Sequence, residues 1–332
     1  CYAVIGGNKM RDLLSTSAAW YVCILSLVIG AVTCNGAPDS EPSEDPHNST
    51  ASTIRIHSHP LTGDEETAYT LRIDSPWPEG GQLHVNFPEH LEYGPVGYTI
   101  TRYSDQRQPA WQVEQEGKLA HYDVESMPDR GVEGVTVQAT ARVVEPNQVR
   151  LGLTITNNSS EILHEVKPLL CFRYKDLSGF SQSTQDNFNY TYVVLNGRVT
   201  ALANIETENP DTMVKAAPVQ GVEPYRFGFS KKRGGYIDAP LDLGLSVITS
   251  EDDTRAVILY APIGKSVLSN RFIPCLHADP YFGDIEPEQH FERIVNVIFA
   301  DADWRNVVNE IMKQHARQSC DQSGKAKYDH RR

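Results

Sequence analysis

Residues 274–290, PCLHADPYFGDIEPEQH, hold several side chains that could do chemistry within a short stretch. If the stretch is extended, Cys275, His277 and Asp279 alternate and point to one side of the strand. An imidazole beside a carboxylate is able to act as an acid/base pair in catalysis. We therefore take His277 and Asp279 as the candidate catalytic residues, in case the chain is an enzyme.

The neighbouring residues fit a pocket for a sugar-sized ligand. Tyr281 could stack on the apolar face of a ring, and Asp284 and His290 could form hydrogen bonds with hydroxyl groups. A purely structural interpretation is also open, in which Asp279 and Asp284 cap backbone amides of a turn and His277 is a half-buried residue with its hydrogen bonds satisfied. The spacing His-x-Asp is a weak metal pattern, so we predict no metal and no cofactor.

A second candidate lies in residues 224–240, PYRFGFSKKRGGYIDAP, a local basic patch among aromatic residues. Arg226 could bind the carboxylate of an acidic sugar or a sulfated glycan, because its planar guanidinium matches such anions. The alternative is a solvated loop whose aromatic residues belong to the core.

The composition and the N-terminal segment bound the class of protein. The formal net charge is −13, which argues against a nucleic-acid partner, because phosphate binding requires a basic face. Residues 1–36 have the layout of an export signal, and 37–53 that of an acidic, Pro- and Ser-rich disordered linker. We expect a periplasmic or extracellular protein, attached to a membrane only if Cys34 carries lipid or the signal stays uncleaved.

The elements that must position these residues are mostly strands. Apolar and polar residues alternate over 135–144 and 149–156, which predicts a hairpin with one buried and one solvent-exposed face. A second hairpin over 191–202 has Asn196-Gly197 as its turn. We predict a large antiparallel β-sandwich over 54–317.

The end of the chain shows one helical pattern. Apolar residues recur at helical spacing from Trp304 to Met312, behind Asp303 as the N-cap, and predict a helix that packs on a sheet. Residues 318–332 are expected to be a disordered tail. Cys171 and Cys275 have apolar surroundings and are expected to be ordinary core residues, with one disulfide as the alternative.

The stretch 149–177, VRLGLTITNNSSEILHEVKPLLCFRYKDL, resembles the galactose-mutarotase-like family of β-supersandwich proteins. The resemblance implies a supersandwich fold and places the family's HPYF catalytic motif at CFRY, residues 171–174. Because Cys171 stands where the family has its general acid histidine, mutarotase activity is not carried over. Arg173 enters the candidate site on this resemblance alone. Two other segments, 274–287 and 189–202, resemble parts of large, uncharacterised exported bacterial proteins.

Three functional hypotheses follow from these patterns. The first is an exported carbohydrate-binding or carbohydrate-associated β-sandwich protein. The second is a carbohydrate-active enzyme (an epimerase, lyase or hydrolase) that uses a His and an acidic residue as its acid/base pair. The third is an envelope or surface protein without a small-molecule site. The ligand and the oligomeric state are left open.

Overall fold

The computed structural model describes residues 53–59, 70–94, 97–101, 109–125, 133–180, 186–209, 211–221 and 234–329. They belong to one compact unit, Ser49–Arg332. The expected export segment 1–36, nearly all of the expected linker and Arg226 lie outside the described residues. In the described part of the chain, no helix has the length and apolar character needed to cross a membrane.

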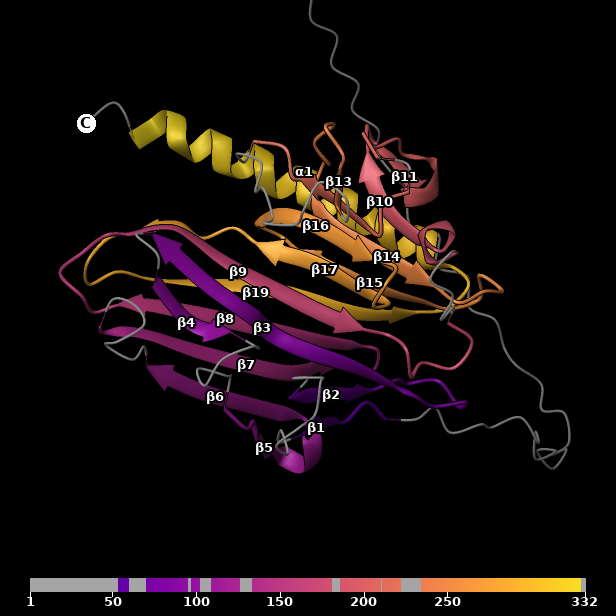
Figure 1. The fold of residues 1–332 in the computed structure, drawn as a ribbon, viewed down its shortest axis with the longest axis horizontal. Helices are drawn as coiled ribbons and strands as arrows, with labels where there is room; N and C mark the ends of the chain where they lie inside the picture. Colours follow the sequence, from indigo (N-terminus) through magenta and orange to yellow (C-terminus); the bar gives the residue numbers. More distant parts are fainter. Residues whose placement is uncertain are drawn as a thin grey trace, which may run out of the picture. The chain divides into compact units, whose positions relative to one another are not determined.

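One sheet has ten strands, in the order β1-β2-β3-β9-β17-β16-β12-β13, with β4 beside β3 and β18 beside β9 (Figure 1). All its neighbours pair antiparallel except β12 and β13. Its strands are β1 Ile56–Ser58, β2 Leu71–Asp74, β3 Gln82–Gly94, β4 Gly97–Thr101, β9 Leu163–Arg173, β12 Val214–Pro218, β13 Gly234–Tyr236, β16 Gly264–Asn270, β17 Cys275–Pro280 and β18 Gly283–Ile285.

The other sheet has nine strands, in the order β11-β10-β14-β15-β19-β8-β7-β6-β5, and every pair is antiparallel. Three short 3-10 helices interrupt the described strands, at Gln115–Gly117, Asn187–Asn189 and Leu202–Asn204. The strands are β5 Gln112–Glu114, β6 Leu119–Glu125, β7 Val135–Glu145, β8 Gln148–Asn157, β10 Thr191–Leu195, β11 Arg198–Ala201, β14 Gly244–Thr249, β15 Ala256–Ala261 and β19 His290–Ala300.

The main core lies between the two sheets, as the alternating pattern predicts. Val137 of β7 and Leu151 of β8 belong to the same buried cluster as Val85 of β3 and Phe172 of β9. Burying one such aliphatic or aromatic side chain stabilises a fold by about 1.5–3 kcal/mol. The pleat of each strand therefore fixes which residues face the other sheet and which face away from it.

Both predicted hairpins are present. β7 and β8 pair from Val135↔Asn157 to Glu145↔Gln148, and β10 pairs with β11 across the Asn196-Gly197 turn. Asn196 and Gly197 have φ of 53° and 71°, which are the left-handed values that a type I′ turn requires.

The predicted helix is present but longer than expected. α1 spans Trp304–Asp329, so helix replaces most of the tail that was expected to be disordered from residue 318. Trp304, Val308 and Ile311 are buried in a second cluster with β14 and β15 of the nine-stranded sheet. The prediction of the tail was wrong because propagating an established helix costs little, and residues 318–329 contain no proline that would stop it.

Candidate functional site

The two strands that carry the candidate residues are neighbours in the ten-stranded sheet. β17 pairs antiparallel with β9, and Cys275 lies opposite Arg173. On these strands Phe172 and Leu276 belong to the core between the sheets. Since successive side chains alternate, Cys171 and Cys275 lie on the other face of the sheet, turned away from the nine-stranded sheet.

A buried cluster of polar and sulfur atoms lies on that face. The Sγ atom of Cys275 is 3.6 Å from Nε2 of His277, and one ligand-type atom from each of Cys171, Cys275 and His277 lies within 4.8 Å of the others. Nδ1 of His277 lies 3.7 Å from Oδ1 of Asp279. All four residues are buried, with 2–3% of their surface exposed. We call these four residues the Cys–His–Asp cluster.

Asp279 is held rigidly at the edge of this cluster. Its Oδ1 accepts a hydrogen bond of 2.9 Å from the backbone N–H of Leu170, and its Oδ2 accepts one of 3.0 Å from the hydroxyl of Ser266. The carboxylate is therefore oriented by two strands that flank β17. The predicted alternation of Cys275, His277 and Asp279 on one side of a strand is confirmed.

The protonation states follow from the surroundings. Burial lowers the pKa of His277, but the Asp279 carboxylate and the Cys171 thiol raise it more, to about 10. Burial raises the pKa of the Cys171 thiol well above its ordinary value. The raised pKa favours a protonated His277 beside Asp279.

Arg173 and Arg226 differ in how they relate to the cluster. Arg173, at the end of β9, is opposite Cys275 on one side and His84 of β3 on the other, so it borders the cluster on the same sheet face. Arg226 lies outside the described residues.

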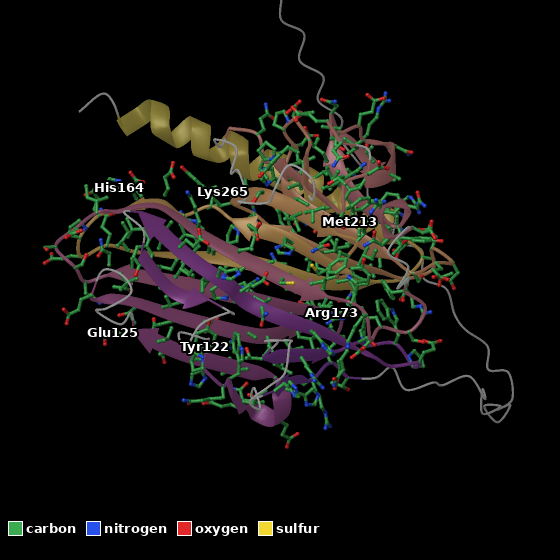
Figure 2. The ribbon with its side chains drawn as sticks, viewed as in Figure 1. Tyr122, Glu125, His164, Arg173, Met213 and Lys265 are labelled. Carbon is green, nitrogen blue, oxygen red and sulfur yellow. The ribbon has the colours of Figure 1, made fainter. Side chains whose placement is uncertain are left out.

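Asp284, Tyr281 and His290 do not join the cluster. Asp284 accepts hydrogen bonds from Nδ1 of His164 and the backbone N–H of Glu165, near the opposite end of β9 from Arg173 (Figure 2). The six residue-to-residue steps from Glu165 to Cys171 span roughly 20 Å of strand. This contact agrees with the structural interpretation of Asp284. Tyr281 is 37% exposed, and exposed His290 begins β19 in the other sheet.

Sequence reasoning missed a pocket of about 590 Å³ at an end of the sandwich. It lies where the β7–β8 turn, the segment between β2 and β3 and the residues after β19 come together. Its apolar lining includes Trp77 and Phe299, and its polar lining includes Lys118, Glu145, Asn147 and Asp301. The remaining lining residues are Thr53, Pro76, Val143, Val144 and Pro146. We call it the Trp77 pocket.

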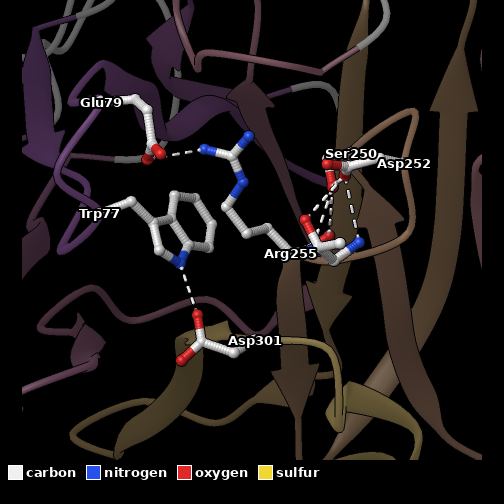
Figure 3. A network of polar contacts seen from close by, with 7 residues as sticks. Trp77, Glu79, Ser250, Asp252, Arg255 and Asp301 are labelled. Carbon is white, nitrogen blue, oxygen red and sulfur yellow. Dashed lines mark hydrogen bonds and ion pairs between the residues drawn. The ribbon is translucent and has the colours of Figure 1, made fainter.

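A polar network orients Trp77 in this pocket. Its indole Nε1 donates a hydrogen bond of 3.0 Å to Oδ1 of Asp301, and the Arg255 guanidinium lies 5.7 Å from its ring centre (Figure 3). Arg255 is itself held by Glu79 through an ion pair of 3.0 Å. The only sequence signal was the aromatic residue in SPWPEGG, a turn between two strands; the partners come from distant segments.

Comparisons with known proteins relate the chain to solved structures. No family model matches the sequence, and no curated protein is significantly similar to it. The Slr1438 protein from Synechocystis sp. PCC 6803 is similar with a TM-score of 0.38 and 9% identity, over 67% of this chain and 78% of that one. The GalM/aldose epimerase homologue from C. elegans has a TM-score of 0.37 and 10% identity, over 69% of this chain and 92% of its own.

A further structure found is the galactose 1-epimerase from Lactobacillus acidophilus NCFM. Its TM-score is 0.38 at 9% identity, over 76% of this chain and 99% of that one. TM-scores this low say nothing of a ligand or an activity. The β-sandwich with a C-terminal helix, as predicted, is established by the strands themselves.

Proposed function

We propose that this chain binds a carbohydrate and that the ligand occupies the Trp77 pocket. The observation that carries the proposal is the composition of this pocket, in which aromatic walls lie beside polar groups with free hydrogen-bonding capacity. Its volume of about 590 Å³ falls within the range of roughly 300–1,000 Å³ that is usual for small-molecule sites.

The polar groups suit hydroxyls in particular. Asp301 uses Oδ1 to accept from Trp77, and Asn147 uses Nδ2 to donate to the carbonyl of Phe299. The second carboxylate oxygen of Asp301, the amide oxygen of Asn147 and the Glu145 carboxylate are acceptors that sugar hydroxyls can satisfy. Lys118 donates to the carbonyl of Ile54 and has further N–H groups for a hydroxyl oxygen.

Binding is a better proposal than catalysis at the residues predicted from the sequence. His277 and Asp279 are 3% and 2% exposed, and both carboxylate oxygens of Asp279 accept hydrogen bonds within the protein. A substrate would have to displace these contacts before it could reach the pair. The Trp77 pocket instead has exposed polar residues in its lining, among them Glu145, Asn147 and Asp301.

The test is a glycan array with neutral and acidic saccharides, followed by titration calorimetry with the best binder. Glu145→Gln and Asp301→Asn should each weaken binding about tenfold, since losing one hydrogen bond of ~1.4 kcal/mol corresponds to that factor. Glu161→Gln, at an exposed residue in the β8–β9 connection, is the matched control and should bind as the wild type does. Failure of the wild type to bind any saccharide would refute the proposal.

Export is a part of the proposal that has separate support. Residues 1–36 combine an early Arg11, an apolar run and small residues, as export signals do. N-terminal sequencing and mass spectrometry of the protein from its native host would test it. A mature N-terminus near Gly36, or lipid on Cys34, is expected, and a chain that stays inside the cell with residues 10–36 intact would contradict it.

A further inference from the structure

The Cys–His–Asp cluster has the composition of a site for a thiophilic metal ion. Cys171, Cys275 and His277 offer two sulfur ligands and one imidazole ligand within 4.8 Å of one another. Thiolate and imidazole together are the ligands that Zn²⁺ prefers. The spacing of Cys275 and His277 on one strand and the position of Cys171 on the next bring the ligands together from two strands.

The distances fit a tetrahedral ion. With Zn–S of about 2.3 Å and Zn–N of about 2.0–2.1 Å, tetrahedral angles put a sulfur and a nitrogen ligand about 3.6 Å apart. The observed separation of Cys275 Sγ and His277 Nε2 is 3.6 Å. An ion could therefore enter the cluster with little rearrangement of this strand.

The Asp279 carboxylate faces the ring nitrogen of His277 that would not bind the metal ion. Zinc-bound histidines usually turn their other ring nitrogen towards a carboxylate or carbonyl, which fixes the ring and strengthens the ligand. Here Nδ1 of His277 has no hydrogen bond and faces Oδ1 of Asp279 at 3.7 Å, while Nε2 faces Cys275. Leu170 and Ser266 hold the carboxylate in that position.

The two cysteines are placed less well for a disulfide than for binding a metal ion. Because Cys275 lies opposite Arg173, Cys171 is its diagonal neighbour across the strand pair. Diagonal neighbours have Cα atoms roughly 7–8 Å apart, whereas a disulfide needs about 4.4–6.8 Å. The structure has no disulfide between these two cysteines, and both are buried.

We propose that Cys171, Cys275 and His277 bind a Zn²⁺ ion, with Asp279 as the residue that orients His277. The ion is held by three protein ligands, as in zinc sites whose fourth position is open to water or another small ligand. This site is separate from the Trp77 pocket, and the test of zinc binding does not depend on whether the chain binds a carbohydrate.

The test uses the full chain, purified with a non-thiol reductant and stripped with a chelator. Added Co²⁺ should give the sulfur-to-cobalt charge-transfer band and the intense visible bands of a tetrahedral site, and Zn²⁺ should abolish them. A variant with the four cysteines outside the cluster changed to serine should keep this spectrum. No charge-transfer band with fully reduced thiols would overturn the proposal.

Variants assign the ion to the cluster. Cys275→Ser and Cys171→Ser should each lose the band or weaken Zn²⁺ binding by more than a hundredfold; Zn²⁺ bound at wild-type affinity by either would overturn the proposal. Asp279→Asn keeps all three ligands and should weaken binding by about 10–100-fold, whereas Asp284→Asn should not change it. If the serine variants fail to fold, the melting temperature is the readout. Zn²⁺ must then raise the melting temperature of the wild type, and it must raise that of Asp279→Asn by a smaller amount. Equal shifts would overturn the role of Asp279.

Discussion

Replacing Asp279 by alanine should destabilise the protein strongly, because it removes one partner of a buried ion pair. Asp279 is 2% exposed and lies 3.7 Å from His277, whose pKa it raises. The alanine variant leaves the His277 imidazolium without its counter-charge. It also leaves the N–H of Leu170 and the hydroxyl of Ser266 without their acceptor.

The size of the effect follows from these contacts. Leaving a buried donor unpaired costs about 1–3 kcal/mol, and removing one partner of a buried ion pair costs about 3–5 kcal/mol in all. We expect a loss of about 3–5 kcal/mol in the free energy of unfolding for Asp279→Ala. Asp279→Asn keeps the shape and one acceptor oxygen, so a loss of about 1–3 kcal/mol is expected.

The assay is urea unfolding followed by tryptophan fluorescence, with a chelator present so that metal binding does not vary between samples. In a double-mutant cycle, Asp279→Ala combined with His277→Leu should cost less than the sum of the two single changes, because the pair is removed together. Asp284→Ala, at an exposed carboxylate, should change stability by less than about 1 kcal/mol. A loss below ~1 kcal/mol for Asp279→Ala, or strict additivity in the cycle, would refute the buried pair.

Three further predictions concern the scaffold. Burial lowers the pKa of His84 to about 4, despite the Asp176 carboxylate 2.8 Å away. Between about pH 6.5 and 4 the unfolded chain therefore binds more protons than the folded one, and stability is lost as the pH falls through this window. His84→Gln should reduce this pH dependence of the free energy of unfolding, measured by unfolding curves across the window. Trp304→Ala should cost about 3–5 kcal/mol by thermal or urea unfolding, since the ring is fully buried, while Trp304→Phe should cost less. Gly244→Ala should cost about 1–3 kcal/mol, because its Cβ would come within 2.7 Å of Gly264 on the facing sheet; an unchanged melting temperature would show that the sheets can separate there.

Local patterns were enough to predict the strands and the helix. The alternation over 135–156 and the left-handed Asn196-Gly197 turn are properties of neighbouring residues, and so is the apolar stripe that starts at Trp304. The end of α1 at Asp329 was missed because a helix without a stop signal ends where competing interactions are balanced, not at a marked residue.

The candidate site could be predicted only in part. The common side of Cys275, His277 and Asp279 follows from the period of a strand. The approach of Cys171 does not, because it depends on which strand pairs with β17 and in what register. The Trp77 pocket depends in the same way on three segments that are distant in the sequence. Asp284 shows why local patterns cannot decide a site, since a turn-capping carboxylate and a ligand-binding one have the same local pattern.

A crystal structure of the chain with the saccharide that binds best on the array would test the proposed carbohydrate-binding function most directly. We predict density for the sugar in the Trp77 pocket, with hydroxyls within hydrogen-bonding distance of Glu145, Asn147 and Asp301. A sugar bound elsewhere, or an empty Trp77 pocket at a saturating concentration of that saccharide, would contradict it.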